Sequence, residues 1–387
     1  MISTARKAER ALLVSAQVFR RHQALPMRAS LSELGELART AGAKVVGSLT
    51  QQLKKPTHYY LGRGKLEQLK ETVLAKRIDT VICDDELTPT QQRNLERALE
   101  EKVKVIDRTA LILDVFAARA QTREGRLQVE LAQHEYLMPR LAGQWSHLER
   151  LGGGIGTRGP GESQIETDRR LVRNRIQRIK KALGQVSRQR DLYRARRRNE
   201  GIPVVSLVGY TNAGKSTLLN SLTAAGVTAE DKLFSTLDPV TRKVRLDSGK
   251  EVLFTDTVGF IQKLPPAIVA AFRATLEEIR EARIIVHVAD VSSPNLANHI
   301  DEVESILDDL KITEKPTVLA LNKTDLLPGA GDSRNGDLLP EILKADEPPP
   351  GVVFISATEH LGLKDLLGEV ERLLGVEEPV ESVVVTA

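Results

Sequence analysis

The sequence predicts an α/β protein that consists of a parallel-sheet α/β domain, a long helical hairpin and a P-loop domain. Three observations lead to this prediction. Short apolar runs alternate with helical patterns over residues 1–110. Two helices with heptad-like spacing then bracket a glycine-rich stretch within residues 111–200. In residues 201–374, an apolar run leads into a glycine loop and a helix, as in phosphate-binding folds. Residues 375–387 are expected to form a tail.

In the first 110 residues, the alternation of strands and helices predicts a parallel sheet with helices packed against it. We expect helices near residues 31–41, 65–76 and 90–101. The expected strands are Ala11–Val18, Lys44–Thr50, His58–Leu61, Thr80–Cys83 and Val103–Ile106. Gly62-Arg63-Gly64 opens one of the helices. We interpret it as a turn, with an anion site or a contact surface as the alternatives.

Composition excludes several classes of protein. The single Cys83 excludes a disulfide framework and any Cys-based metal site, and the seven His show no metal-ligand spacing. No apolar stretch approaches the ~20 residues of a membrane-spanning helix. The run Ala11–Phe19 is interpreted as a strand rather than a signal peptide, because Arg20 and Arg21 follow it and a cleavage pattern is missing. We expect a monomeric, cytoplasmic protein.

The most informative motif follows the apolar run Val204–Val208 and precedes a helical stretch over Thr217–Leu222. Its glycines allow backbone N–H groups to surround a polyphosphate, Lys215 neutralises the β/γ charge, and Ser216 offers a hydroxyl to Mg²⁺. The predicted phosphate-binding residues are Gly209, Tyr210, Thr211, Asn212, Ala213, Gly214, Lys215, Ser216 and Thr217.

A second motif, Asp256-Thr257-Val258-Gly259, closes the apolar run Val252–Phe254. Asp256 is placed to hold Mg²⁺ through a water molecule, and Gly259 allows its N–H to approach the γ-phosphate. The motif is weak alone, but it follows Lys215 at the distance that a P-loop GTPase requires.

A third motif, Asn322-Lys323-Thr324-Asp325, follows the apolar run Val318–Leu321. The Asp325 carboxylate can accept from both guanine N1–H and the N2 amino group, a pair that adenine lacks. The Lys323 stem can lie against the base. Ser356-Ala357, after Val352–Ile355, would add a backbone N–H for guanine O6. Together the motifs predict a GTPase domain that binds GTP and GDP and hydrolyses GTP with Mg²⁺.

A switch segment, Phe234–Pro239, lies between the first two motifs. We select Thr236 as the hydroxyl that ligates Mg²⁺ only when the γ-phosphate is present, with Ser235 and Thr241 as competitors. Lys215, Thr236 and Gly259 are therefore the expected catalytic residues.

The residue after Gly259 is Phe260, which cannot orient water as Gln does in many GTPases, so intrinsic hydrolysis should be slow. Asn212 is a candidate ligand for K⁺ that would assist hydrolysis. The alternative is that Asn212 only accommodates the geometry of a turn.

The middle of the chain predicts an antiparallel helical hairpin with a glycine-rich tip at Gly152–Gly161. Its second helix is basic: Glu162–Glu200 holds 13 Lys and Arg against five Asp and Glu, a net charge of +8 in a chain of net charge +4. Either this charge is a solvated face, or it binds RNA phosphates. The RNA-binding candidates are Arg169, Arg170, Arg173, Arg194, Arg196, Arg197 and Arg198.

Nearly the whole chain resembles the HflX family of ribosome-associated GTPases. The specific segments are Gly152–Glu162, Glu166–Arg170, Phe234–Pro239, Gly259–Pro265 and Asp107–Thr109 with Ile112–Phe116. The resemblance implies a protein that binds the large ribosomal subunit and its RNA in the GTP form. It also implies that the hairpin reaches towards the peptidyl-transferase region, and that the protein splits or rescues stalled or idle ribosomes.

Two other functions compete with this interpretation. One is a ribosome-assembly or RNA-modification GTPase, which would associate with immature particles rather than with 70S ribosomes. The other is a P-loop ATPase or kinase, against which Asp325 argues. A second nucleotide site at the glycine-rich tip is disfavoured, because no strand precedes it and no Lys-Ser follows it.

Overall fold

A computed structural model describes most of the chain in two compact units. The described residues are 8–18, 26–100, 102–143, 164–199, 201–223, 233–263, 265, 268, 273–312, 314–327 and 350–375. The first unit comprises Met1–Asp191 with Gln262–Arg273, and the second comprises Leu192–Ile261 with Ala274–Ala387. Within the described residues, no helix is both long enough and apolar enough to cross a bilayer.

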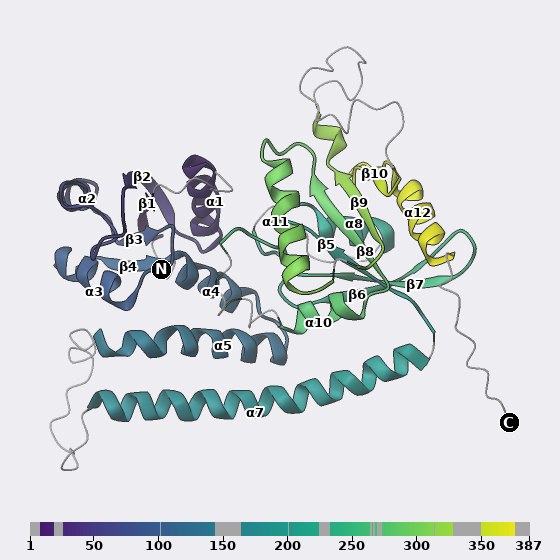
Figure 1. Ribbon diagram of the computed structural model, residues 1–387, viewed down its shortest axis with the longest axis horizontal. Helices are drawn as coiled ribbons and strands as arrows, with labels where there is room; N and C mark the ends of the chain where they lie inside the picture. The colour runs from purple at the N-terminus through teal and green to yellow at the C-terminus, as the bar shows by residue number, and fades with distance from the viewer. Residues whose placement is uncertain are drawn as a thin grey trace, which may run out of the picture. The chain divides into compact units, whose positions relative to one another are not determined.

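The first unit contains a four-stranded parallel sheet with the strand order β2-β1-β3-β4. Its strands are β1 (Arg10–Val18), β2 (Lys44–Leu53), β3 (Thr80–Cys83) and β4 (Lys104–Asp107). Its helices are α1 (Met27–Thr40), α2 (Arg63–Lys76), α3 (Pro89–Ala98) and α4 (Arg108–Arg119). Figure 1 shows α2 and α3 on one side of the strands and α1 and α4 on the other. The predicted parallel sheet with helices against it is confirmed.

The predicted strand at His58–Leu61 is wrong, because these residues form a turn. The Tyr60 N–H donates to the Thr57 carbonyl at 3.3 Å, and Tyr60 has a left-handed φ of 65°. Tyr60 and Leu61 are both buried, which gives this turn the apolar character of a strand. The next residue, Gly62, precedes helix α2 and donates its N–H to Gln51 Oε1 at 2.8 Å. This geometry agrees with the turn interpretation of Gly62-Arg63-Gly64.

A charged cluster lies where β3 and β4 end. Arg108 and Asp84 are each 1% exposed, and Arg108 Nη1 donates to Asp84 Oδ1 at 3.0 Å. Arg108 also pairs with Glu33, while Asp84 Oδ2 accepts from Ser30 Oγ and Lys263 Nζ, each at 2.8 Å. Buried charges are tolerated only when they are paired and hydrogen-bonded. The cluster therefore holds together the ends of two strands, α1 and the segment that contains Lys263.

The helical hairpin consists of α5 (Arg123–Leu137), the short 3₁₀ helix η1 (Met138–Gly143) and α7 (Gln164–Asn199). Figure 1 shows α5 and α7 side by side. The apolar face of α7 includes the buried Ile176 and Ile179, two of the positions that the heptad spacing predicts. Ion pairs between described side chains join the helices, and they include Glu130–Arg175, Glu135–Lys180 and Glu124–Arg190. The predicted glycine-rich tip lies outside the described residues.

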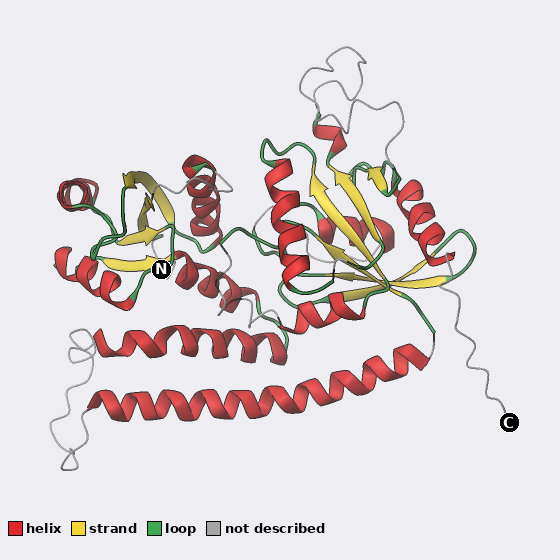
Figure 2. Ribbon diagram, viewed as in Figure 1, coloured by secondary structure: helices red, strands yellow, loops and turns green. Residues whose placement is uncertain are grey.

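The second unit contains a six-stranded sheet with the order β10-β9-β8-β5-β7-β6, in which only β6 is antiparallel to its neighbour. Its strands are β5 (Val204–Val208), β6 (Val240–Arg245), β7 (Glu251–Asp256), β8 (Ile284–Asp290), β9 (Thr317–Asn322) and β10 (Val352–Phe354). Its helical segments are α8 (Lys215–Thr223), α10 (Arg273–Glu281), α11 (Leu296–Asp309), the 3₁₀ turn η2 (Thr324–Leu326) and α12 (Leu363–Gly375). Figure 2 shows this layered α/β arrangement by element type. The helix predicted at Leu363–Leu374 is confirmed as α12.

Replacement of Arg108 by Met tests the charged cluster. The variant leaves the carboxylate of Asp84 buried without its main counter-charge, which costs about 3–5 kcal/mol of unfolding free energy in comparable buried pairs. We expect a clear fall in the urea midpoint of the first unit. Arg39→Met is the matched control, because Arg39 pairs with Glu36 on the exposed side of α1 and should change the midpoint little. Equal midpoints for the two variants would show that the cluster does not stabilise this unit.

Candidate nucleotide-binding site

The phosphate loop lies between the end of β5 and the start of α8, as the motif predicts. Two glycines are required by close approach of neighbouring atoms. A Cβ on Gly209, whose φ is 152°, would lie 2.1 Å from the Val288 carbonyl oxygen. A Cβ on Gly214, whose φ is 95°, would lie 2.2 Å from Asn322 Nδ2. Any side chain here would push the loop away from the strands that hold it.

Lys215 is buried at the base of this loop, with 6% of its surface exposed. Burial lowers the pKa of Lys215 to about 8, against the opposing charge of Asp256. Its Nζ donates to the carbonyl oxygens of Gly209 at 3.1 Å and of Tyr210 at 2.8 Å. The ammonium group is therefore held inside the loop, where a β- or γ-phosphate would supply the missing negative charge.

Three oxygens that the sequence assigns to Mg²⁺ meet at one point. Ser216 Oγ lies 2.6 Å from Asp256 Oδ2 and 2.8 Å from Thr236 Oγ1, and Thr236 Oγ1 lies 2.8 Å from Asp256 Oδ2. Burial raises the pKa of Asp256, whereas Lys215 opposes this shift. Among the described residues, no hydrogen-bond partner reaches the other carboxylate oxygen, the buried Asp256 Oδ1. Two hydroxyls and a carboxylate with a free oxygen fit a hard cation such as Mg²⁺.

Thr241, one of the competitors for the switch role, is engaged elsewhere. It belongs to β6, and its Oγ1 lies 3.0 Å from Thr255 Oγ1 on the neighbouring strand β7. Thr236 instead follows Phe234, whose N–H donates to Thr211 Oγ1 of the phosphate loop at 3.1 Å. The structure thus brings the Thr236 segment, and not Thr241, to the phosphate loop.

The second motif packs directly on the phosphate loop. A Cβ on Gly259 would lie 2.6 Å from Thr211 Cα and 3.1 Å from Lys215 Nζ. The next residue, Phe260, donates its N–H to the Gly209 carbonyl at 3.0 Å and accepts from the Thr211 N–H at 2.7 Å. Gly259 is therefore next to the place where a γ-phosphate would meet Lys215. Thr257 and Val258 are fully buried behind it.

The predicted base-binding residues converge at the ends of β9 and β10. Asn322 Nδ2 donates to the Ala213 carbonyl at 2.8 Å, and Asn322 Oδ1 accepts from the Ala357 N–H at 3.0 Å. Ser356 Oγ donates to Asp325 Oδ1 at 2.6 Å. The Thr324 hydroxyl donates to a backbone carbonyl of the same region, that of Ile355, at 3.0 Å. Asn322 thus ties the phosphate loop to the base-binding loops.

The other predicted site residues lie in the phosphate loop, in α8 and in α7, and the structure describes the side chains of only some of them. Asn212 adopts a left-handed φ of 62°, which supports the turn interpretation, while K⁺ at this position stays a prediction. Thr217 lies in the first turn of α8. Arg169, Arg170 and Arg173 lie in the described part of α7. Arg194, Arg196, Arg197 and Arg198 lie in the same helix, but their side chains fall outside the described ones.

Sequence reasoning missed Asp290 and His299. Asp290 Oδ2 lies 2.7 Å from Lys323 Nζ, and the His299 ring stacks on the ring of Tyr210 at 3.9 Å between centroids. Asp290 ends an apolar strand, the same signal that identified Asp256. His299 gives no such signal, because it lies within a helix whose packing against the phosphate loop is a tertiary contact.

The fold and this site define a P-loop GTPase. Three family models match the chain: "GTP-binding GTPase N-terminal" at residues 28–117, "GTP-binding GTPase Middle Region" at 119–197 and "50S ribosome-binding GTPase" at 204–323. They agree with the predicted GTP-binding and GTP-hydrolysing enzyme.

Comparison with known proteins gives the family. The chain is 52% identical to the GTPase HflX of Caldanaerobacter subterraneus subsp. tengcongensis over 354 residues, which are 91% of this chain and 79% of that relative. It is 46% identical to the GTPase HflX of Escherichia coli K12, over 89% of this chain and 79% of the relative. A GTP-binding protein of Sulfolobus solfataricus in complex with GDP shows 24% identity and a TM-score of 0.47, over 94% of this chain and 98% of that one. The chain belongs to the HflX family of GTPases, as the resemblance implied.

Replacement of Asp325 by Asn tests the base-binding residues. The amide keeps one acceptor oxygen but replaces the other with a donor, so guanine loses a partner for its paired donors. Xanthine, which carries a carbonyl at C2, becomes acceptable instead. We expect at least a hundredfold loss of GTP affinity and a gain of XTP affinity, since sites built on polar pairing discriminate strongly, by roughly 10⁴ or more in other enzymes. Titration with both nucleotides measures the exchange, and an unchanged GTP affinity would contradict this assignment.

Replacement of Thr236 by Ala tests the cation site. The Thr236 hydroxyl is expected to contact Mg²⁺ only when a γ-phosphate is present, so the variant should bind GDP normally and hydrolyse GTP at least tenfold more slowly. Thr241→Ala is the matched control, because its hydroxyl bonds Thr255 in the β6–β7 pair. If Thr236→Ala hydrolysed GTP at the parental rate, the switch role would move to Ser235.

Proposed function

We propose that this GTPase associates with the large ribosomal subunit in its GTP form and splits or rescues stalled or idle ribosomes. The match of residues 204–323 to the family model described as a 50S ribosome-binding GTPase supports the ribosomal partner. The basic outer face of α7, which faces away from α5, is the observation in this chain that carries the proposal.

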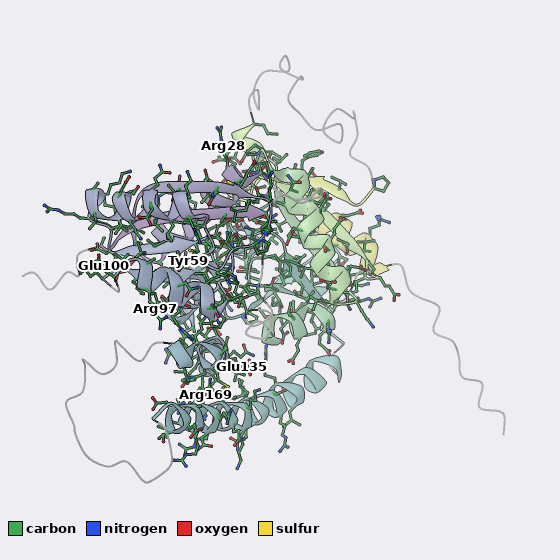
Figure 3. All side chains as sticks on the ribbon, turned by 60° about the vertical axis from the view of Figure 1, so that its left-hand side comes forward. Arg28, Tyr59, Arg97, Glu100, Glu135 and Arg169 are labelled. Atoms are coloured by element: carbon green, nitrogen blue, oxygen red, sulfur yellow. The ribbon has the colours of Figure 1, made fainter. Side chains whose placement is uncertain are left out.

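Both faces of α7 carry basic residues, but those of the inner face form ion pairs with α5. Arg175, Lys180 and Arg190 pair with glutamates of α5. At 100° per residue, a second group of basic residues falls on the opposite side of the helix, apart from Arg173, which lies at the border of that side near the direction of Lys180. All of them are exposed, and they are Arg170, Arg173, Arg178, Lys181 and Arg188. Figure 3 shows nitrogen-tipped side chains that project from this side of α7.

We name Arg170, Arg173, Arg178, Lys181 and Arg188 the outer basic stripe. Arg188 lies 18 positions after Arg170, so the stripe extends over about 27 Å of helix. Arginine forks match phosphate oxygens, and clustered cations gain free energy by releasing counterions from a nucleic acid. A row of charges on a rigid helix suits the backbone of structured RNA, which proteins recognise by shape. The described part of the stripe contains no aromatic side chain for base stacking, so single-stranded RNA is a poorer match.

We assign the chemistry of GTP hydrolysis to the phosphate loop and the two motifs that face it. Lys215 and the loop N–H groups would bind and orient the phosphates, and Gly259 would offer its N–H to the γ-phosphate. Ser216 and Thr236 would hold Mg²⁺ directly and Asp256 through water. When bound, Mg²⁺ would neutralise charge that develops on the phosphate oxygens. Phe260 cannot orient water, so intrinsic turnover should be slow and should rise on the ribosome.

The domain borders, the oligomeric state, the location and a K⁺ site are also part of this proposal. We place the domain borders near residues 110 and 200, with a GTPase domain that extends to residue 374. We also propose that the protein acts as a monomer in the cytoplasm and that K⁺ assists beside Asn212. A ribosome-assembly or RNA-modification role is the alternative, which stable association with immature particles alone would favour.

Neutralisation of the outer basic stripe tests the proposal. The triple variant Arg178→Gln, Lys181→Gln and Arg188→Gln should bind 50S subunits more weakly with a non-hydrolysable GTP analogue present. Each lost phosphate contact lowers the slope of log K against log salt by roughly 0.7 to 0.9, so three contacts change it by about two to three. Co-sedimentation at several potassium concentrations measures this slope, and GTP affinity of the free protein should stay unchanged.

The matched control removes three exposed charges from the second unit: Arg242→Gln, Lys250→Gln and Lys311→Gln. We expect this control to keep the parental salt slope. If the α7 variant and the control bound ribosomes like the parent at every salt concentration, the outer stripe would be a solvated face. A parent protein that binds no ribosomal particle with the GTP analogue would contradict the proposed function as a whole.

A further inference from the structure

Asp290 is a charged residue at the edge of the nucleotide site to which none of the GTPase motifs assigns a role. It is the last residue of β8, and in the parallel ladder with β9 it lies directly opposite Asn322. Parallel strands present their carboxyl ends at one edge, where ligands of such folds bind. Asp290 therefore lies beside the base-binding motif because of its register, although 32 residues separate it from Asn322 in the sequence.

Both oxygens of the Asp290 carboxylate are engaged. Oδ2 lies 2.7 Å from Lys323 Nζ, in an ion pair whose side chains are 21% and 25% exposed. Oδ1 accepts from the Ser292 N–H at 3.0 Å and from Ser292 Oγ at 2.6 Å. The second set of bonds fixes the orientation of the carboxylate within its own turn. A fixed carboxylate gives the lysine a single preferred position, which a mobile one would not.

Lys323 needs such an external constraint because of its place in the chain. It follows Asn322, whose amide holds the phosphate loop, and it precedes Asp325 by two residues. Its φ of 69° is left-handed, so no regular helix or strand directs its side chain. A free lysine stem has several rotatable bonds, and their freedom is lost when the stem is ordered against a ligand. An ion pair that orders the stem beforehand removes part of that cost from binding.

We propose that Asp290 is a positioning residue for guanine-nucleotide binding, which holds the Lys323 stem in the orientation that packs against the base. Asp290 does not touch the nucleotide in this proposal and acts only through Lys323. Loss of the Asp290 charge should lower the affinities for GDP and GTP equally, because Lys323 contacts the base, which both nucleotides share, and not the γ-phosphate. The inference depends on the GTPase site and is independent of any ribosomal role.

The surroundings of Asp290 support a role in the site. His299 of α11 stacks on Tyr210 of the phosphate loop, with an angle of 9° between the rings. Burial lowers the pKa of His299, and the negative charge of Asp290 opposes this shift, which places the carboxylate in the electrostatic surroundings of that ring. Asp290 thus interacts electrostatically with His299, which stacks on the phosphate loop, and forms an ion pair with Lys323 of the base-binding motif.

A double-mutant cycle tests the proposal with titrations of fluorescent GDP and GTP analogues. Asp290→Asn keeps the shape of the side chain and an acceptor for Ser292, and removes the charge that pairs with Lys323. We expect it to weaken both nucleotides about five- to tenfold. Lys323→Met should weaken them by at least as much, and the double variant should lose no more than Lys323→Met alone. Asp309→Asn, at an exposed aspartate near the end of α11, is the control that should bind like the parent.

Two further measurements separate positioning from a general loss of structure. Inosine triphosphate lacks the N2 amino group that Asp325 recognises, so Asp290→Asn should weaken ITP and GTP by the same factor. Ser292→Ala removes the hydroxyl bond that helps to orient the carboxylate but keeps the backbone N–H bond and the charge of Asp290. It should weaken GDP about two- to threefold without lowering the melting temperature of the free protein. Parental GDP affinity in Asp290→Asn would overturn the proposal. The proposal would also be overturned if the losses of binding free energy caused by Asp290→Asn and Lys323→Met were fully additive in the double variant. A change in the ratio of ITP to GTP affinity in Asp290→Asn would overturn it as well.

Discussion

The nucleotide site depends on one constraint, the alignment of four parallel strands whose carboxyl ends reach the same edge of the sheet. The strands β7, β5, β8 and β9 are neighbours, and each ends in a group of the site. These groups are Asp256, the phosphate loop, Asp290 and Asn322. None of them could be held at these distances by its local sequence alone. The ladder hydrogen bonds of a buried sheet fix their spacing, and the short loops after each strand then carry the polar atoms.

The same alignment explains why the site contains so many buried polar groups. Lys215, Asp256, Thr257 and Ser356 are all nearly inaccessible to solvent. Burial shifts the pKa of Lys215 downward and that of Asp256 upward, because each charge has lost its water. A triphosphate with Mg²⁺ would supply the opposite charge to each. Without nucleotide and Mg²⁺, the buried charges of Lys215 and Asp256 are only partly compensated. Binding of the nucleotide and the ion completes this compensation and is therefore favoured.

The sequence alone was enough to predict the elements that rest on local chemistry. The P-loop needs glycines at fixed positions, and Asp256 and Asn322 end apolar runs, so a periodic pattern and a motif locate them. The turn at Tyr60 escaped prediction because two buried neighbours imitate a strand. Asp290 escaped because its role depends on a strand register with Asn322. The stack of His299 on Tyr210 could not be predicted, since it depends on how a helix packs.

In the long helix α7, the sequence pattern predicts one face and the tertiary structure is needed to interpret the other. Its heptad spacing predicts the inner face that contains Ile176 and Ile179, and its ion pairs with α5 account for three of its basic residues. Only the structure shows that these three basic residues face α5, while the basic residues of the outer stripe take no part in these ion pairs. This distinction is the basis of our proposal that the outer stripe, rather than the whole basic helix, binds a phosphate backbone.

A crystal structure of the protein with Mg²⁺ and a non-hydrolysable GTP analogue would show whether the predicted site residues bind the ion and the base. We predict that the hydroxyls of Ser216 and Thr236 ligate the ion, that Asp256 reaches it through water, and that Asp325 accepts both donors of guanine. The Gly259 N–H should lie within hydrogen-bond distance of the γ-phosphate. A cation bound by Ser235 or Thr241, or a guanine ring without contact to Asp325, would contradict the account.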